Sequence, residues 1–157
     1  MKHKAKILIV DDEKNIRDYL DLILSMEGYK CSQASSGEEA LDILEKEEFE
    51  LLITDIRMPG ISGTELIKEA TKIRPHIASI VISAVEQVET AVESLKSGAY
   101  DYITKPIIDQ ERLMLTVERA LERRNLKLEN LRYQRYLEDM VQQRTKYIRD
   151  LFFRAIT

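Results

Sequence analysis

Five short apolar runs alternate, over the first two thirds of the chain, with segments in which apolar side chains recur every three or four positions. The first run, residues 6–10, is rich in β-branched side chains, and the helix-spaced series that follows it is ended by Gly28. The alternation predicts strands at residues 6–10, 29–34, 51–54, 77–82 and 100–103, and helices at residues 15–26, 37–47, 63–73 and 86–96. Several of these strands are apolar on both faces, which is typical of a parallel sheet covered on both sides. The pattern therefore predicts an α/β fold with a doubly wound, five-stranded parallel sheet.

The last part of the chain has a different pattern. No Gly or Pro occurs from Asp109 to Thr157, and helix formers dominate, so we expect a fifth helix that continues as one long helix. Two sets of residues keep heptad spacing, with a phase break between them: Val117, Leu121, Arg124, Leu128 and Leu131, then Leu137, Val141, Arg144, Ile148 and Leu151. A parallel homodimeric coiled coil fits this spacing, and arginines at seam positions would weaken it. We therefore expect a domain at residues 1–120 and a coiled-coil linker helix at residues 121–157.

Composition limits the kinds of function open to the chain. Its 157 residues suit one domain with an extension, and the hydrophobic share of 44% is too high for a disordered chain. The net charge of −4 and the absence of a concentrated basic patch argue against direct nucleic-acid binding by this fragment. No apolar run has the length of a membrane span and no signal peptide is evident, so we expect a cytoplasmic protein without membrane contact. The single cysteine, Cys31, excludes an internal disulfide and a Cys-rich zinc site.

Polar residues stand where the predicted strands end. Asp11 and Asp12 close the first strand, Asp55 closes the third, Ser83 closes the fourth, and Lys105 follows the fifth. The carboxyl ends of parallel strands meet at one rim, where ligands of such folds bind. Crowded carboxylates repel one another unless a cation lies among them, and Mg²⁺ is a hard ion that prefers oxygen ligands. The sequence therefore predicts a Mg²⁺ site at this rim.

Four motifs along the chain resemble those of the response-regulator receiver family. They read ILIVDDE at residues 7–13, LITDIRMPG at 52–60, VISA at 81–84 and GAYDYITKP at 98–106. The resemblance covers about residues 5–120, and the ordered occurrence of all four motifs is far more specific than any one alone. It implies a flavodoxin-like receiver domain with strand order 2-1-3-4-5, and hence a phosphoacceptor in a two-component (phosphorelay) signalling system.

The resemblance also implies a role for each matching residue. Asp55 would accept the phosphoryl group from a sensor histidine kinase. Mg²⁺ would be held by Asp12, Asp55, the main-chain carbonyl of Arg57 and, through water, Asp11. Lys105 and Ser83 would bind the phosphoryl oxygens, small Ala84 would leave the site accessible, and Tyr102 would turn inward as Ser83 moves. The peptide bond between Lys105 and Pro106 is expected to be cis. The switch surface would comprise the fourth helix, the fifth strand and the fifth helix.

The tail carries a second resemblance. The segments YLEDMVQQRT at residues 136–145 and LFFRAIT at residues 151–157 look like the linker that joins receivers to HD-GYP cyclic di-GMP phosphodiesterase domains. No His-Asp metal pair follows them, so we expect a piece of a longer regulator and no phosphodiesterase activity in this fragment. Linkers to histidine kinase or diguanylate cyclase domains can look much the same.

The strand-end residues are also compatible with different roles. Asp11 and Asp12, taken alone, could merely cap the following helix. A phosphatase of the haloacid dehalogenase type would also use a strand-end aspartate with Mg²⁺, but it needs a second aspartate where this chain has Arg57. A receiver fold used only as a phosphorylation-independent dimerisation scaffold is the remaining alternative, and the intact set of site residues argues against it.

Overall fold

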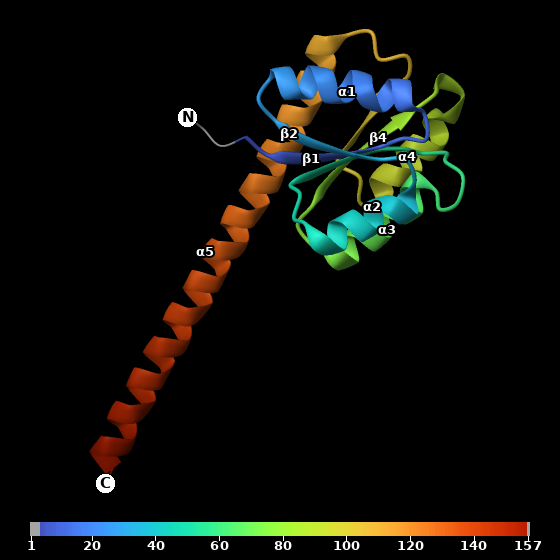
Figure 1. The fold of residues 1–157 in the computed structure, drawn as a ribbon. Coiled ribbons are helices and arrows are strands. Elements are labelled where there is room, and N and C mark those ends of the chain that lie inside the picture. The colour runs from blue at the N-terminus through green and yellow to red at the C-terminus, as the bar shows by residue number, and fades with distance from the viewer. Residues whose placement is uncertain (1–3, 157) are drawn as a thin grey trace. The chain divides into compact units, whose positions relative to one another are not determined.

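The computed structural model describes residues 4–156, apart from the side chain of Val85. The strands are β1 (Lys6–Val10), β2 (Lys30–Ala34), β3 (Leu51–Asp55), β4 (Ala78–Ser83) and β5 (Asp101–Thr104). The helices are α1 (Lys14–Met26), α2 (Gly37–Lys46), α3 (Gly63–Ile73), α4 (Val88–Lys96) and α5 (Gln110–Ile156), with the 3-10 turn η1 (Val85–Gln87) before α4. All strand pairs are parallel and the sheet order is β2-β1-β3-β4-β5, which confirms the predicted flavodoxin-like fold (Figure 1).

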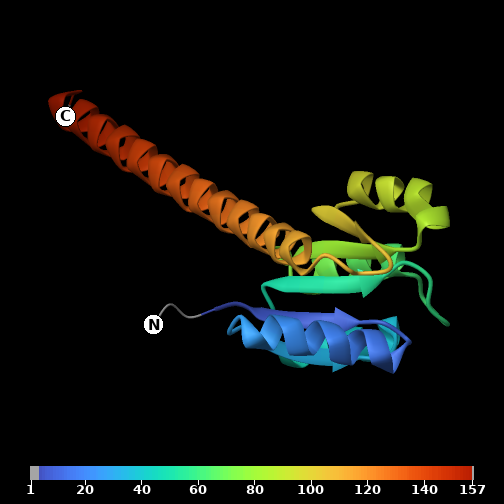
Figure 2. The same ribbon diagram turned by 90° about the horizontal axis from the view of Figure 1, so that it is seen from above.

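Alternate side chains of the strands feed two hydrophobic cores, one on each face of the sheet. Ile7 and Ile9 of β1 pack with Leu20 and Leu24 of α1 and with the first turns of α5. The neighbouring residues of β1 point the other way, into a core that α2, α3 and α4 complete. Figure 1 shows α1 on one side of the sheet and α2 and α3 on the other, and Figure 2, seen from the α1 side, shows α1 lying over the strands. The central strands β3 and β4 are buried along their whole length, so they have no polar face for solvent.

Serine side chains begin two of the helices near the carboxyl rim. The Ser36 hydroxyl accepts a hydrogen bond from the Glu39 N–H (3.1 Å) at α2, and the Ser62 hydroxyl accepts one from the Glu65 N–H (3.2 Å) at α3. In both cases a glycine follows the cap as the first helical residue. These caps fix where each helix starts relative to the strand before it.

Cys31 lies half-buried on β2. The pKa of its thiol is raised from an ordinary value of 9.0 to about 11, mainly by burial and partly by the charge of Asp21, while a hydrogen bond with Ser25 opposes the change. Because the thiolate is the reactive form, we expect alkylation at pH 8 to be about 100-fold slower in the native protein than in the urea-unfolded chain. Iodoacetamide labelling followed by intact mass measures both rates. Equal rates in the two states would contradict the expectation.

The chain divides into two compact units, Met1–Arg124 and Asn125–Thr157, and the long helix α5 contributes residues to both. Val117 and Leu121, which the heptad pattern placed on a dimer seam, instead lie in the core of the first unit with exposed fractions of 0% and 9%. That part of the seam prediction was wrong, because the same spacing that suits a coiled coil also suits a helix packed on a sheet.

The second unit is helical and exposes many large apolar side chains: Tyr133, Tyr136, Leu137, Met140, Val141, Tyr147, Ile148, Leu151, Phe152, Phe153 and Ile156. Within the described residues, no helix is both long enough and apolar enough to span a membrane.

Candidate functional site

The parallel register brings the ends of the strands together. Val10 pairs with Thr54, and Asp55 pairs with Ile82, so the residues that follow β1 and end β3 and β4 lie at one edge of the sheet. The Lys105 N–H donates to the Ser83 carbonyl (2.7 Å), which attaches the residue after β5 to the end of β4. The peptide bond between Lys105 and Pro106 is cis. The rim predicted from the sequence is therefore present as one surface.

Three carboxylates lie close together on this rim. One ligand atom each from Asp11, Asp12 and Asp55 lies within 4.8 Å of the others. Asp11 is fully buried and Asp55 is 6% exposed, whereas Asp12 is exposed to solvent. Backbone N–H groups hold the two buried side chains: Glu13 donates to Asp11 Oδ1 and Ile56 donates to Asp55 Oδ1, both at 2.9 Å. The cluster thus has two fixed carboxylates and one that faces solvent.

Lys105 supplies the positive charge of the cluster. Its Nζ donates a hydrogen bond to Asp55 Oδ2 (3.1 Å) and lies 3.2 Å from Asp11 Oδ2 in an ion pair. Only 19% of the lysine side chain is exposed. A single ammonium group is therefore shared between the two buried carboxylates.

Even with Lys105 beside them, the buried carboxyl groups of Asp11 and Asp55 lose a proton less readily than an aspartate in water. Burial raises the pKa of Asp55 above its ordinary value despite the hydrogen bond and charge of Lys105. Burial also raises the pKa of Asp11, and the charge of Asp55 adds to this effect, whereas the N–H of Glu13 and the charge of Lys105 oppose it. For Lys105, burial alone lowers the pKa, but the hydrogen bond to Asp55 and the charges of both aspartates outweigh it and raise the pKa. Burial therefore leaves both carboxylates poorly stabilised as anions, and a further cation beside them would stabilise the charged forms.

Two buried oxygen atoms of the site are available to bind a cation or another ligand. Asp11 Oδ2, despite its ion pair with Lys105, and Ser83 Oγ have no hydrogen-bond partner among the described residues. Buried polar atoms without a partner are costly and are rare in folded proteins. Three carboxylates with free oxygen lone pairs fit a hard divalent cation such as Mg²⁺.

The remaining predicted residues surround this cluster. Ala84 is half-buried, and its N–H donates to the Gln87 side chain (3.3 Å). Tyr102 is half-buried and packs against the core on the α2–α4 side of the sheet. Arg57 is exposed just beyond β3.

Sequence analysis predicted residue 63 as the start of a helix but did not identify Gly63 as important for the site. This first residue of α3 donates its N–H to the Ile56 carbonyl (2.7 Å), and a Cβ at this position would overlap the Asp55 carbonyl oxygen. Only a glycine lets α3 approach the end of β3 so closely. The Ser-Gly pair at residues 62–63 is the one local signal, and by itself it indicates only a helix start.

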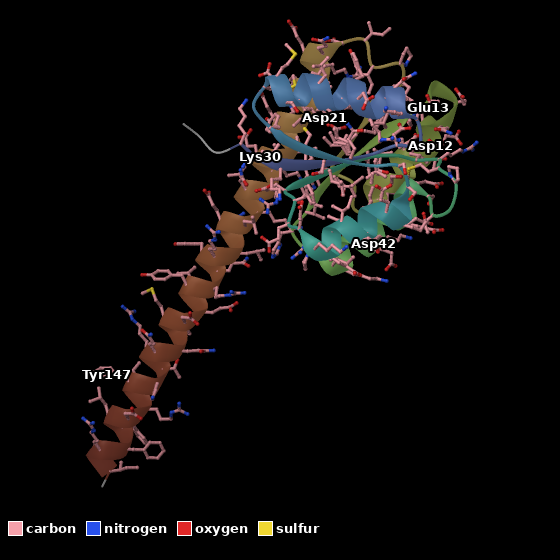
Figure 3. The ribbon with its side chains drawn as sticks, in the orientation of Figure 1. Asp12, Glu13, Asp21, Lys30, Asp42 and Tyr147 are labelled. Atoms are coloured by element: carbon pink, nitrogen blue, oxygen red, sulfur yellow. The ribbon has the colours of Figure 1, made fainter. Side chains whose placement is uncertain are left out.

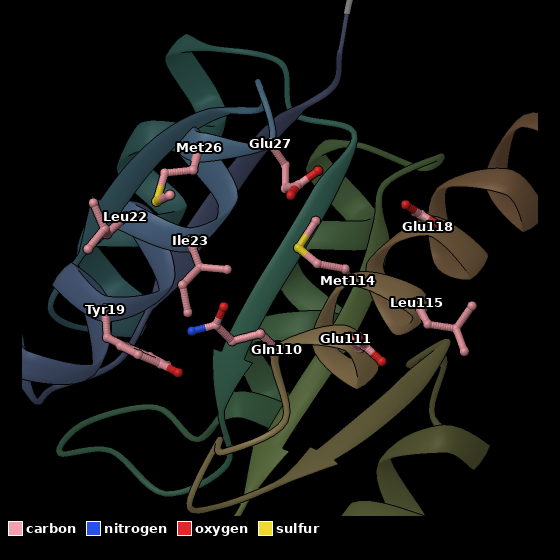
Figure 4. Close-up of a pocket in the computed structure, with 10 residues that line it drawn as sticks. All are labelled: Tyr19, Leu22, Ile23, Met26, Glu27, Gln110, Glu111, Met114, Leu115 and Glu118. Carbon is pink, nitrogen blue, oxygen red and sulfur yellow. The ribbon is translucent and has the colours of Figure 1, made fainter.

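Two hollows lie beside α1. One, of about 660 Å³, is lined by residues that include Ile16, Tyr19, Ala84, Lys105 and Pro106, so it opens next to the carboxylate cluster. The other, of about 590 Å³, lies between α1 and α5 (Figure 4). Its ten lining residues include three glutamates and no lysine or arginine, so it offers no positive charge to an anionic ligand. Of the two hollows, only the first is lined by a lysine.

Comparisons with known proteins agree with this geometry. The model of the response regulator receiver domain matches residues 7–118. The regulatory protein AtoC of Escherichia coli K12 is 38% identical over 124 residues, which cover 79% of this chain and 27% of AtoC. The transcriptional regulatory protein ZraR of Klebsiella oxytoca is 39% identical over 118 residues, 75% of this chain and 26% of ZraR. The chain spans about a quarter of the length of these curated relatives.

Solved structures give the same result. A response regulator receiver domain protein from Clostridium thermocellum superposes with a TM-score of 0.73 at 33% identity, covering 78% of this chain and 98% of that one. NtrX from Brucella abortus in complex with ADP superposes with a TM-score of 0.77 at 40% identity, covering 80% of this chain and 29% of NtrX. The chain therefore belongs to the response regulator receiver domain family, whose members receive signals in two-component systems.

Proposed function

We propose that this chain is a Mg²⁺-dependent phosphoacceptor in which Asp55 takes the phosphoryl group from a sensor histidine kinase. The observation that carries the proposal is the position of the Asp55 carboxylate, next to two further carboxylates and hydrogen-bonded to Lys105. A hollow lined in part by Lys105 and Ala84 opens beside these groups and could receive part of a phosphodonor. A cytoplasmic location would suit such a partner.

The chemistry requires little more than these groups. A carboxylate oxygen of Asp55 forms a bond to phosphorus, the bond from phosphorus to the kinase histidine nitrogen breaks, and its electron pair stays on the imidazole. Bound Mg²⁺ would neutralise negative charge on the transferring oxygens. Asp12, Asp55 and the main-chain carbonyl of Arg57 would hold it directly, and Asp11 would hold it through water. Lys105 would move its ammonium group from Asp55 to the new phosphoryl oxygens.

We propose that Ser83 and Tyr102 transmit the effect of phosphorylation from the site to the surface of the domain. The buried Ser83 hydroxyl is without a hydrogen-bond partner among the described residues, so it is available to donate to a phosphoryl oxygen. Small Ala84 beside it leaves space for this approach. Tyr102, which is half-buried on β5, would turn inward as Ser83 moves and so alter the surface of α4, β5 and α5.

We propose that the second unit is a homodimeric coiled coil leading to an output domain. Its many exposed apolar side chains need a partner, and a second copy of the same helix supplies one. The segments at residues 136–145 and 151–157 favour an HD-GYP cyclic di-GMP phosphodiesterase as the output. The name of ZraR points to regulation of transcription instead, but both ZraR and AtoC extend far beyond the length that this chain spans.

The test is phosphorylation by a small donor such as acetyl phosphate, followed by intact mass, with Mg²⁺ and with EDTA. We expect a gain of one phosphoryl group that needs Mg²⁺ and is lost in Asp55→Asn. Asp42→Asn is the matched control, because Asp42 lies on α2, away from the carboxylate cluster (Figure 3). Sedimentation of the same samples measures the dimer fraction. A dimer that takes up no phosphoryl group from any donor would favour the phosphorylation-independent scaffold.

A further inference from the structure

Arg17 connects the loop before α1 to strand β2. Its Nη1 donates to the main-chain carbonyl of Asp11 (2.7 Å), and its Nε donates to the side-chain oxygen of Gln33 (3.3 Å). The guanidinium group is planar and rigid, so two acceptors on different segments fix its orientation. Arg17 is half-buried, so these bonds are partly shielded from water.

Gln33 is held in turn by α1. Its Nε2 donates to Asp21 Oδ2 (2.8 Å) and to Asp18 Oδ1 (3.3 Å). Figure 3 shows Asp21 on α1, the helix that follows the loop carrying Asp12 and Glu13. The side-chain oxygen of Gln33 therefore faces Arg17 because its amide nitrogen is already engaged.

The position of Arg17 does not serve the stability of α1 itself. The helix begins at Lys14, its first turn contains no acidic residue, and Glu13 at its N-cap makes no side-chain capping bond. A cation close to a helix N-terminus is unfavourable, because the helix dipole is positive there. The hydrogen bonds to Asp11 and Gln33 are thus the evident reason for an arginine at this place.

The hydrogen bond from Arg17 to the Asp11 carbonyl restricts the backbone of Asp12. The Asp11 carbonyl and the Asp12 N–H belong to one rigid peptide plane, so fixing the carbonyl limits how the Asp12 backbone can turn. On the other side, the Glu13 N–H is bound to the Asp11 side chain (2.9 Å). Asp12 itself is exposed and lies between these two anchors.

We propose that Arg17 is a positioning residue for the Mg²⁺ site, which it serves by orienting the peptide that carries Asp12. This inference rests on the proposed Mg²⁺ dependence. It assigns Arg17 no contact with metal or phosphoryl group. Its effect reaches the site through the backbone, and Gln33 shares that effect.

The sign of the change in Mg²⁺ affinity tests the inference. Removing a positive charge near a cation site strengthens cation binding by Coulomb attraction, whereas loss of a positioning contact weakens it. We expect Arg17→Met to weaken Mg²⁺ binding about tenfold, as is usual for outer partners of a metal site. Lys14→Met is the matched control, because Lys14 is an exposed cation in the same helical turn. It should bind Mg²⁺ as tightly as the native chain, or more tightly.

Isothermal titration calorimetry with MgCl₂ gives the affinities, and thermal unfolding shows whether each variant is folded. Gln33→Met keeps the charge of Arg17 but removes one of its acceptors, so it should weaken binding by a smaller factor and covers the case in which Arg17→Met does not fold. With acetyl phosphate, Arg17→Met should need about tenfold more Mg²⁺ for half-maximal phosphorylation and reach a near-native maximal rate.

Each outcome has a definite meaning. Weaker binding in Arg17→Met and Gln33→Met, but not in Lys14→Met, supports the positioning role. Affinities in Arg17→Met equal to those in Lys14→Met overturn it and leave the Mg²⁺ proposal intact. A native chain that binds no Mg²⁺ overturns both.

Discussion

Replacing Lys105 with methionine is expected to slow phosphorylation of Asp55 about 100-fold. Removing one positioned hydrogen-bond donor that stabilises negative charge in a transition state usually has an effect of about this size. Lys105 is placed for this role, because its Nζ already donates to Asp55 Oδ2 (3.1 Å) from a largely buried position. Methionine keeps much of the side-chain length and loses the charge. The rate is measured by intact mass during reaction with acetyl phosphate at saturating Mg²⁺.

The same substitution should lower the thermal stability of the metal-free protein. Asp11 and Asp55 would be left buried without their shared cation, and an unpaired buried charge is strongly destabilising. Mg²⁺ should raise the melting temperature of Lys105→Met more than that of the native chain, since it replaces the missing charge. Lys96→Met makes the same chemical change at an exposed position on α4 and should alter neither property. A native rate in Lys105→Met would refute the role given to this lysine.

Gly63→Ala is expected to destabilise the fold by about 3 kcal/mol, at the upper end of the usual cost of overpacking. The added methyl group would overlap the Asp55 carbonyl oxygen and lie 3.0 Å from its carbonyl carbon. Backbone atoms cannot rotate away, so either α3 must move outward or β3 must shift at the residue that carries the site. Thermal unfolding should show a fall in melting temperature of about 10 °C.

Gly37→Ala is the matched control for this change. Gly37 also follows a serine cap as the first residue of a helix, and an added Cβ would also be crowded there. The crowding atoms, however, belong to the flexible and partly exposed side chain of Ile61, which can adopt another rotamer. We expect a cost below about 1 kcal/mol. Similar losses of stability in the two variants would show that the backbone of Asp55 is less constrained than the structure indicates.

The hydrophobic pattern was sufficient to predict the order and type of the elements. Strand β1 and helix α3 have the predicted bounds, because their apolar runs are bordered by polar or capping residues. Strand β4 begins and ends one residue later than predicted, at Ala78 and Ser83, since hydrogen bonds to β3 and β5 set its limits and periodicity does not. The tail was partly misread, because Val117 and Leu121 pack on the sheet.

The candidate site was predictable to a different extent. Residues at strand ends, such as Asp55 and Lys105, are visible from the sequence because parallel topology brings all strand ends to one rim. Arg17 and Gly63 gave no such signal. The importance of Arg17 depends on the distance from its guanidinium group to the Asp11 carbonyl, and that of Gly63 depends on the approach of two backbone segments. Neither distance is encoded in a local pattern.

The arrangement of Lys105 between two carboxylates also has a consequence for ion selectivity. Three aspartates and one lysine give the rim a formal charge of −3 + 1 = −2 when all four groups are ionised. One divalent cation balances this charge completely, whereas one sodium or potassium ion leaves half of it in place. At the proposed Mg²⁺ site, the number of charges alone would therefore favour one divalent cation over one monovalent ion, before the size or geometry of the ion is considered.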